Sequence, residues 1–345
     1  MLATDSNVLI RARAPLRISF AGGGTDVAPF PEVEGGAVLS ATINRYAFAT
    51  LRPRSDRQVT VESLDYGLSV KFGIDDPLAF DGSLDLAKAA VHRLLDRQYD
   101  GFDLFLHTNA PPGSGLGSSS AVVVTLVGLL QERYRLALTD YEIAEIAYQI
   151  EREDLRIKGG LQDFYAATFG GFNYIEFTGD RVVVNPLRIH PDTINELEHN
   201  LLLVYTGRTR LSDHIIDDQM GRYASGETDS LEGLRQQRAL AKEMKDALLR
   251  RRHEEFGHLL GQAWLAKRRL SPKIATPEID EAYDVAVQHG ALGGKVTGAG
   301  GGGYMIFYCR FDRRHLVAEE LIKLGFTVAE VTFEADGLKT WRLGG

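Results

Sequence analysis

The segment 111–121 has the residue types of a phosphate-binding loop. It reads PPGSGLGSSSA and runs directly into an apolar stretch rich in Ala, Val and Leu. Glycines let a backbone approach a ligand closely, and the first N–H groups of a helix attract anions because the helix dipole places partial positive charge there. Serine hydroxyls can also bind magnesium. The residues predicted to hold the anion are Pro112, Gly113, Ser114, Gly115, Leu116, Gly117, Ser118, Ser119 and Ser120.

Two familiar phosphate motifs do not fit this loop. No Gly-Lys-Ser or Gly-Lys-Thr closes it, as a Walker A loop requires, and the acidic residue context of a dinucleotide-binding turn is missing. The sequence therefore excludes a P-loop NTPase and a Rossmann dehydrogenase. The plain alternative is a Gly/Ser connection that only caps a buried helix. Other segments of the chain weigh against that alternative.

Two carboxylates follow the loop at positions suited to phosphoryl transfer, which needs charge neutralisation, an in-line hydroxyl and often a base. Glu151 closes the helical pattern AYQIE, and Asp163 comes shortly after the glycine pair 159–160, which can redirect the chain into a cleft. An isolated carboxylate is more often a solvated charge or a helix cap. Glu153 and Asp154 also compete with Glu151 for its role.

Two more glycine-rich segments lie near the ends of the chain, APLRISFAGGGTD at 14–26 and KVTGAGGGG at 295–303. Together with 111–121 they resemble, in sequence and in order, the three motifs of the GHMP kinases, a family that includes galactokinase, homoserine kinase and mevalonate kinase. The resemblance implies ATP as phosphate donor and Mg2+ as cofactor. It also implies an α+β fold with an N-terminal domain like the second domain of ribosomal protein S5, a ferredoxin-like C-terminal domain, and an active site between them.

The resemblance further implies roles for individual residues. Asp163 is similar to the aspartate that orients or deprotonates the attacking hydroxyl. Arg17 is similar to the basic residue that lowers the pKa of that hydroxyl or stabilises the transferred charge. Ser119 and Glu151 are similar to the serine and carboxylate that hold magnesium. From residue type alone, a surface ion pair is the alternative role for Arg17.

The first motif also bears on the acceptor. Gly23 and Gly24 stand where galactokinase has a glutamate and a histidine, so the contacts to the far end of a galactose are missing. The motif 14–26, with YTGRTR at 205–210 and GALGGKVTGAGG at 290–301, most closely resembles bacterial D-glycero-D-manno-heptose 7-phosphate kinases. L-fucokinases share part of it. The resemblance thus implies phosphorylation of an anomeric hydroxyl, giving the 1,7-bisphosphate of the heptose. The residues that it assigns to the substrate are Gly23, Gly24, Thr25, Asp26, Arg210, Gly300 and Gly301.

A substrate that already carries a phosphate needs cations at the distal end of its pocket. The candidates are Lys158, Arg208, Arg210, Lys267 and Lys273. Each has a plain alternative as a solvated surface cation. Two other functions stay open, an L-fucokinase-like or other sugar 1-kinase and a catalytically silent sugar or nucleotide sensor on the same fold.

The elements that must position these residues follow from hydrophobic periodicity. Strands are predicted at 8–20, 37–53, 58–64, 67–72, 102–107 and 201–205, and helices at 84–97, 139–154, 211–270 and 277–289. The apolar stretch after the phosphate loop is predicted as a helix that packs against the helix at 139–154. We place a domain boundary near residue 190, which gives an N-terminal ATP-binding domain at 1–190 and a C-terminal domain at 191–345.

Composition limits the remaining classes. The net charge of -8 argues against a nucleic-acid or acidic-membrane partner, whose binding would need a basic surface. The first residues lack the apolar core of a signal peptide and no apolar run is long enough to span a bilayer, so a cytoplasmic protein is expected. Cys309, the single cysteine, is predicted as a buried structural thiol. We expect a monomer or homodimer that acts on a small sugar or sugar phosphate.

Overall fold

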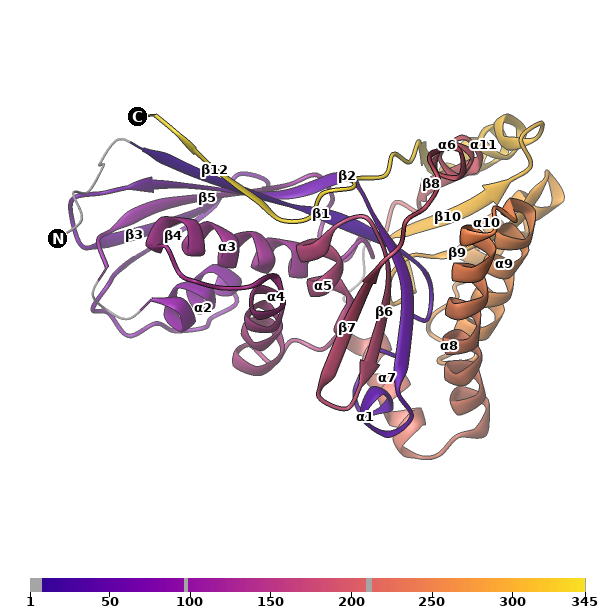
Figure 1. Ribbon diagram of the computed structural model, residues 1–345, viewed down its shortest axis with the longest axis horizontal. Helices are drawn as coiled ribbons and strands as arrows, with labels where there is room; N and C mark the ends of the chain where they lie inside the picture. The colour runs from indigo at the N-terminus through magenta and orange to yellow at the C-terminus, as the bar shows by residue number, and fades with distance from the viewer. Residues whose placement is uncertain (1–7, 96–98, 209–212, 345) are drawn as a thin grey trace.

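Two β-sheets form the framework of the protein (Figure 1). The computed structural model describes residues 8–95, 99–208 and 213–344. Within these ranges, eight strands form one sheet and four strands form the other. None of the helices in the same ranges combines the length and apolar character needed to span a bilayer.

The first sheet has the strand order β12-β1-β2-β5-β3-β4, with β6 paired to β2 and to β7. All its pairs are antiparallel except β3 with β5. Its strands are β1 (Leu9–Ala21), β2 (Gly36–Pro53), β3 (Gln58–Ser63), β4 (Leu68–Gly73), β5 (Phe102–Thr108), β6 (Phe172–Thr178), β7 (Arg181–Pro186) and β12 (Lys339–Leu343).

Strand β1 carries the first motif into the interior. Its second half is buried on both faces, although polar residues alternate with apolar ones there. Leu16, Ile18 and Phe20 are in the core. Because side chains alternate along a strand, Arg17 and Ser19 share the opposite face. That face lines the pocket described below.

Helices cover one side of the first sheet (Figure 1). Helix α3 packs on β1 and β2 and contacts α2, α4 and α5. The elements on this side are α2 (Asp85–Leu94), α3 (Ser118–Tyr134), α4 (Asp140–Tyr148), a π-helical segment (Gln149–Asp154) and α5 (Gln162–Phe169). A short helix, α1 (Phe30–Val33), lies between β1 and β2 in the chain.

The second sheet is antiparallel with the order β11-β8-β10-β9. This order, with helices between β8 and β9 and between β10 and β11, is the ferredoxin-like arrangement expected for the C-terminal part. Its strands are β8 (Leu201–Tyr205), β9 (Ala291–Val296), β10 (Tyr304–Cys309) and β11 (Thr327–Ala329). The helices of this part are α6 (Pro191–Asn200), α7 (Asp213–Ala224), α8 (Thr228–Leu249), α9 (His253–Arg268), α10 (Pro277–Gln288) and α11 (Arg314–Lys323).

Several elements differ from the sequence prediction. The helix expected at 139–154 is α-helical only to Tyr148 and continues as a π-helical segment. The helical pattern expected at 211–270 corresponds, within the described residues, to α7, α8 and α9. The first two of these end near Gly226 and Arg251, which adopt positive φ. The last strand, β12, leaves the C-terminal part and pairs with β1. The domain boundary near residue 190 stays a prediction. Strand β12 follows this boundary in the sequence but belongs to the first sheet in space.

Candidate active site

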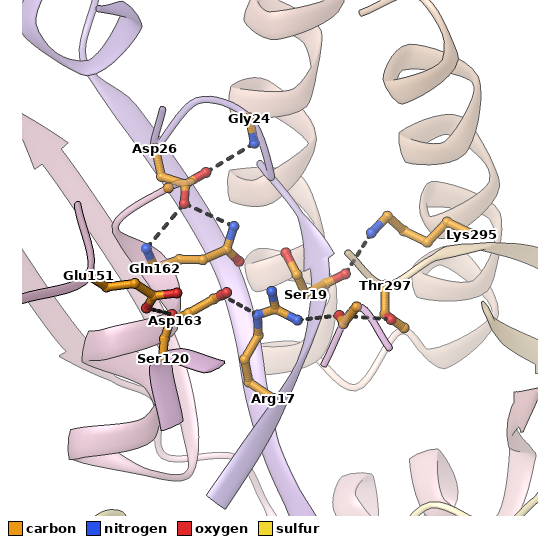
Figure 2. Close-up of polar contacts among 12 residues, drawn as sticks. Arg17, Ser19, Gly24, Asp26, Ser120, Glu151, Gln162, Asp163, Lys295 and Thr297 are labelled. Atoms are coloured by element: carbon orange, nitrogen blue, oxygen red, sulfur yellow. Dashed lines mark hydrogen bonds and ion pairs between the residues drawn. The ribbon is translucent and has the colours of Figure 1, made fainter. Parts of the chain in front are cut away.

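A polar cavity of about 150 Å³ lies between the two parts of the chain. Its walls come from β1, the glycine-rich turn after β1, the phosphate loop, the start of α5, the end of α9 and the end of β9. Figure 2 shows the polar contacts that line it. Segments far apart in the sequence therefore meet at one place.

The phosphate loop has the geometry of an open anion site. Gly113, Gly115 and Gly117 have φ of 69°, 80° and 74°, a region that favours glycine. Gly117 is the N-cap of α3 and no side chain caps the helix, so the first N–H groups of α3 lack side-chain acceptors. The start of a helix in this condition suits a phosphate. Ser118 and Ser119 both line the cavity.

The third motif holds this loop in place. A Cβ on Gly298 would lie 2.4 Å from Gly115 Cα, and a Cβ on Gly303 would lie 2.4 Å from the Ser114 carbonyl oxygen. The Thr297 hydroxyl donates to the Gly115 carbonyl at 3.0 Å. The two backbones thus touch directly, which glycine alone permits.

Arg17 and Asp163 form an ion pair beside the loop (Figure 2). Arg17 Nε donates to Asp163 Oδ1 at 2.6 Å, and Arg17 Nη1 donates to the Gly115 carbonyl at 2.7 Å. A Cβ on Gly117 would lie only 3.2 Å from Asp163 Cγ, so glycine lets the loop approach the carboxylate. Oδ2 of Asp163 accepts no hydrogen bond from the described residues, which leaves one oxygen for a ligand.

Glu151 lies on the π-helical segment and is fully buried. Its Oε2 accepts a hydrogen bond from Ser120 at 2.9 Å, while Oε1 lies 3.3 Å from Arg152 Nη1 without forming a hydrogen bond. The structure therefore puts Ser120, and not Ser119, in contact with this carboxylate. Ser119 is exposed and lines the same cavity as Glu151.

Asp26 anchors the turn after β1. Its Oδ1 accepts from Gly24 N at 3.0 Å, and its Oδ2 accepts from the backbone and side-chain nitrogens of Gln162, both at 3.1 Å (Figure 2). A Cβ on Gly160 would lie 2.0 Å from Oδ2, so this close approach needs glycine. Burial raises the pKa of Asp26, and the nearby Asp163 adds to the rise.

Two lysines are buried in the same pocket. Lys295 Nζ donates to the Ser19 carbonyl at 2.6 Å, and burial holds the pKa of Lys295 below its usual value. Burial also lowers the pKa of Lys267 to about 8, while Asp26 raises it and Arg17 lowers it further. Lys267 forms no hydrogen bond or ion pair through its ammonium with any described residue.

Several predicted residues lie outside this cavity. Thr25 is buried, and its hydroxyl bonds to the carbonyls of Gly22 and Ala37. Gly300 and Gly301 pack on Ile274 away from the cavity, and Gly298 of the same run lines it instead. The physical reason is that the run turns back on itself before β10.

The five candidate cations separate clearly. Lys267 and Lys158 line the cavity, but Lys158 pairs with Asp217. Arg208 pairs with Glu278 at 2.8 Å, and Lys273 pairs with Asp218 at 3.1 Å, both outside the cavity. Arg210 lies outside the described residues.

A second cavity, of about 540 Å³, adjoins the phosphate loop and shares Ser118, Ser119 and Ile157 with the first. Apolar and aromatic side chains make up much of its wall, among them Tyr66, Phe80 and Leu106. Such a wall suits a flat aromatic base. Aromatic side chains can stack on the faces of the base, and apolar contact removes the base and the side chains from water.

Sequence reasoning did not select four of the residues that build the site, namely Ser19, Gln162, Lys295 and Thr297. Lys295 and Thr297 belong to the quoted third motif, at alternate positions of one extended segment. That alternation was the signal that both face the same side. Nothing in the sequence marks Gln162, whose role depends on the fold bringing it to Asp26.

Known proteins are similar to this chain over nearly its whole length. Residues 85–171 match the family described as GHMP kinases N terminal domain, and residues 244–325 match GHMP kinases C terminal. The chain is 38% identical to a D-glycero-alpha-D-manno-heptose 7-phosphate kinase of Campylobacter jejuni, over 97% of this chain and 99% of that protein. It is 28% identical to the L-fucokinase/L-fucose-1-P guanylyltransferase of Bacteroides fragilis, over 87% of this chain and 34% of that protein.

A solved structure also resembles this chain over nearly its whole length. The crystal structure of a D-glycero-D-manno-heptose 1-phosphate kinase from Bacteroides thetaiotaomicron superposes with a TM-score of 0.81 at 33% identity, over 97% of this chain and 100% of that one. The fold is that of a small-molecule kinase. The chain belongs to the GHMP kinase family, and the predicted α+β fold is confirmed.

Proposed function

We propose that this protein transfers the γ-phosphate of ATP to the anomeric hydroxyl of a sugar, D-glycero-D-manno-heptose 7-phosphate, and so forms the 1,7-bisphosphate. The observation that carries the proposal is the Asp163 carboxylate, which Arg17 holds beside the phosphate loop and at the wall of a polar cavity. The identity of 38% over nearly the whole length of a heptose 7-phosphate kinase supports this choice of sugar.

Asp163 and Arg17 supply the chemistry in this proposal. The sugar hydroxyl attacks the γ-phosphorus of ATP, and its proton passes to the free Oδ2 of Asp163. The bond from the γ-phosphorus to the bridging oxygen breaks, and ADP leaves with that oxygen. Arg17 keeps the carboxylate oriented and places positive charge next to the transferred group, which favours the transition state.

The nucleotide would occupy both cavities. The N–H groups at the start of α3 and the glycines of the loop would bind its phosphates, and the apolar second cavity would take its base. Ser118 and Ser119 line both cavities, as expected for residues beside the phosphates.

The residues present also fit a magnesium ion. Glu151 Oε1 is buried without a hydrogen bond, and Ser119 lines the same cavity. The described residues contain no cluster of three or more His, Cys, Asp or Glu side chains that would hold a metal. Mg2+ commonly takes one carboxylate and completes its shell with water and substrate phosphates. When bound, it would neutralise phosphate charge.

A coupled assay of ADP release tests the proposal. ATP and Mg2+ are supplied with a panel of heptose 7-phosphates, L-fucose, galactose and other hexoses. Turnover should be highest with the heptose phosphate, and phosphorus NMR should show a new anomeric phosphate. Turnover with L-fucose alone would favour a fucokinase. Binding of ATP and sugar by calorimetry without any ADP would indicate a silent sensor.

A further inference from the structure

Lys267 is a buried cation that feels the charge of Asp26 but forms no ion pair with any residue that the structure describes. It lies in the last turn of α9, only 5% of its surface is exposed, and it lines the central cavity. Its ammonium has no hydrogen-bond or ion-pair partner among the described residues. An ammonium taken out of water without a partner is costly, so a ligand is the natural source of the missing charge.

Neighbouring residues increase the free-energy cost of burying the Lys267 ammonium. Lys295 is buried nearby, and repulsion from Lys267 contributes to lowering its pKa. Asp26 is the neighbouring carboxylate, yet both of its oxygens already accept hydrogen bonds from nitrogens of Gly24 and Gln162. Five cationic residues and three carboxylates line the cavity, namely Arg17, Arg152, Lys158, Lys267 and Lys295 against Asp26, Glu151 and Asp163.

Gly23 lines the cavity beside this charge and has space for a methyl group on its Cα. A Cβ there would meet Ser19 Oγ at 3.5 Å, Gln162 Nε2 at 3.7 Å and Lys267 Nζ at 3.9 Å, all ordinary contact distances. The φ of Gly23 is not in the left-handed region, so the fold does not demand glycine. Gly24 differs, because its φ is 103° and a Cβ would lie 2.6 Å from Gln219 Nε2.

We propose that the space at Gly23 is the subsite for a phosphate carried by the acceptor, and that Lys267 binds that phosphate and determines specificity for a phosphorylated sugar. The proposal rests on the proposed kinase function. A phosphate dianion offers several acceptor oxygens, and the wall offers an ammonium, an amide N–H and a hydroxyl without a partner, that of Ser19. A neutral sugar hydroxyl would accept a hydrogen bond from one of these donors but would not neutralise the charge of the Lys267 ammonium.

The test compares two acceptors, D-glycero-D-manno-heptose 7-phosphate and the same heptose without phosphate. We expect Lys267→Met to lower kcat/KM for the phosphorylated acceptor by about 10²-fold or more, the usual effect of removing one partner of a buried charge pair. The loss should appear mainly in KM. For the unphosphorylated heptose the loss should be much smaller, so the ratio of the two kcat/KM values falls. Lys267→Arg should retain most of the preference.

Gly23→Ala is an independent variant that does not depend on removing a charge. The added methyl fits without a clash and occupies the subsite, so the melting temperature should stay close to that of the wild type. We expect KM for the heptose phosphate to rise by about tenfold, since the phosphate then loses its close approach to the ammonium. KM for ATP should not change.

Lys273→Gln is the matched control, because Lys273 is exposed, pairs with Asp218 and does not line the cavity. Both acceptors should react with it as with the wild type. An equal loss for both acceptors in Lys267→Met would overturn the proposal, as would a rise in KM for ATP. The proposal would also fail if Lys158→Gln, and not Lys267→Met, abolished the preference.

A binding experiment separates this proposal from the kinase function. Calorimetry with the heptose 7-phosphate and with the heptose measures the subsite even if the wild type shows no turnover. Tighter binding of the phosphorylated sugar, lost in Lys267→Met and weakened in Gly23→Ala, would support the subsite although the kinase function had failed. Equal binding of the two sugars to the wild type would refute the subsite.

Discussion

Replacing Asp163 by asparagine removes the proposed proton acceptor and changes little else. The asparagine Oδ1 can still accept the hydrogen bond from Arg17 Nε, which the carboxylate accepts at 2.6 Å. The variant loses the charge and the basic oxygen Oδ2. General base catalysis contributes about 10²- to 10⁴-fold, so we expect kcat to fall by about 10²-fold or more.

The burial of the Arg17–Asp163 ion pair determines how much stability Asp163→Asn costs. The side chains of the ion pair are 6% and 19% exposed, so water screens the pair only in part. A hydrogen bond to a charged group contributes about 1.5–3 kcal/mol, and Asn keeps the neutral part of it. We therefore expect the free energy of unfolding to fall by about 1–2 kcal/mol, too little to unfold the protein.

Three measurements decide this prediction, namely kcat from ADP release, KM for ATP and the melting temperature. KM for ATP should stay within about threefold, because a group that acts in the transition state does not bind the nucleotide. Glu153→Gln is the control, since Glu153 is an exposed carboxylate on the π-helical segment and lies outside the cavity. A kcat close to that of the wild type would remove Asp163 from the role of base. A rise in KM for ATP that matched the loss would assign it to nucleotide binding.

Three further predictions follow from the same geometry. Ser119→Ala should raise the magnesium concentration needed for half-maximal rate by about tenfold, and an unchanged magnesium titration would remove the serine from the metal site. The pKa of Lys267 is lowered to about 8, so its ammonium loses its proton as pH rises through that value. We therefore expect kcat/KM for a phosphorylated sugar to fall above pH 8. Lys267→Arg should keep its activity there, because arginine stays protonated. Gly298→Ala should raise KM for ATP by about tenfold or more, since its Cβ would lie 2.4 Å from Gly115 Cα; Gly221→Ala, with open space at its Cβ, should leave KM unchanged.

The family and the fold class could be predicted from the sequence because they depend on contiguous motifs. The phosphate loop at 111–121 combines glycine, serine and an apolar helix, and each of these has a local physical meaning. The buried state of Cys309 also followed from its apolar neighbours and is confirmed. The strand at Leu201–Tyr205 was predicted with the bounds that the structure gives.

The rest of the site depends on contacts between residues distant in sequence. Lys267 was one of five equivalent cations, and only its burial against the turn at Gly23 separates it from Lys273, which is exposed. Ser120 contacts Glu151, which is buried on the π-helical segment, and that segment has no clear signal in the sequence. Gly300 and Gly301 lie outside the cavity because the glycine run turns back on itself before β10.

The contacts around the Gly115 carbonyl oxygen explain why three motifs so far apart act together. This oxygen accepts from Arg17 Nη1 of the first motif and from the Thr297 hydroxyl of the third, and it belongs to the phosphate loop itself. Arg17 in turn holds Asp163. The loop that would bind ATP, the carboxylate that would accept the proton and the C-terminal sheet are therefore linked through one arginine and one carbonyl. A displacement of the second sheet relative to the first must change the loop and the carboxylate together, so binding and chemistry depend on the same packing between the two sheets.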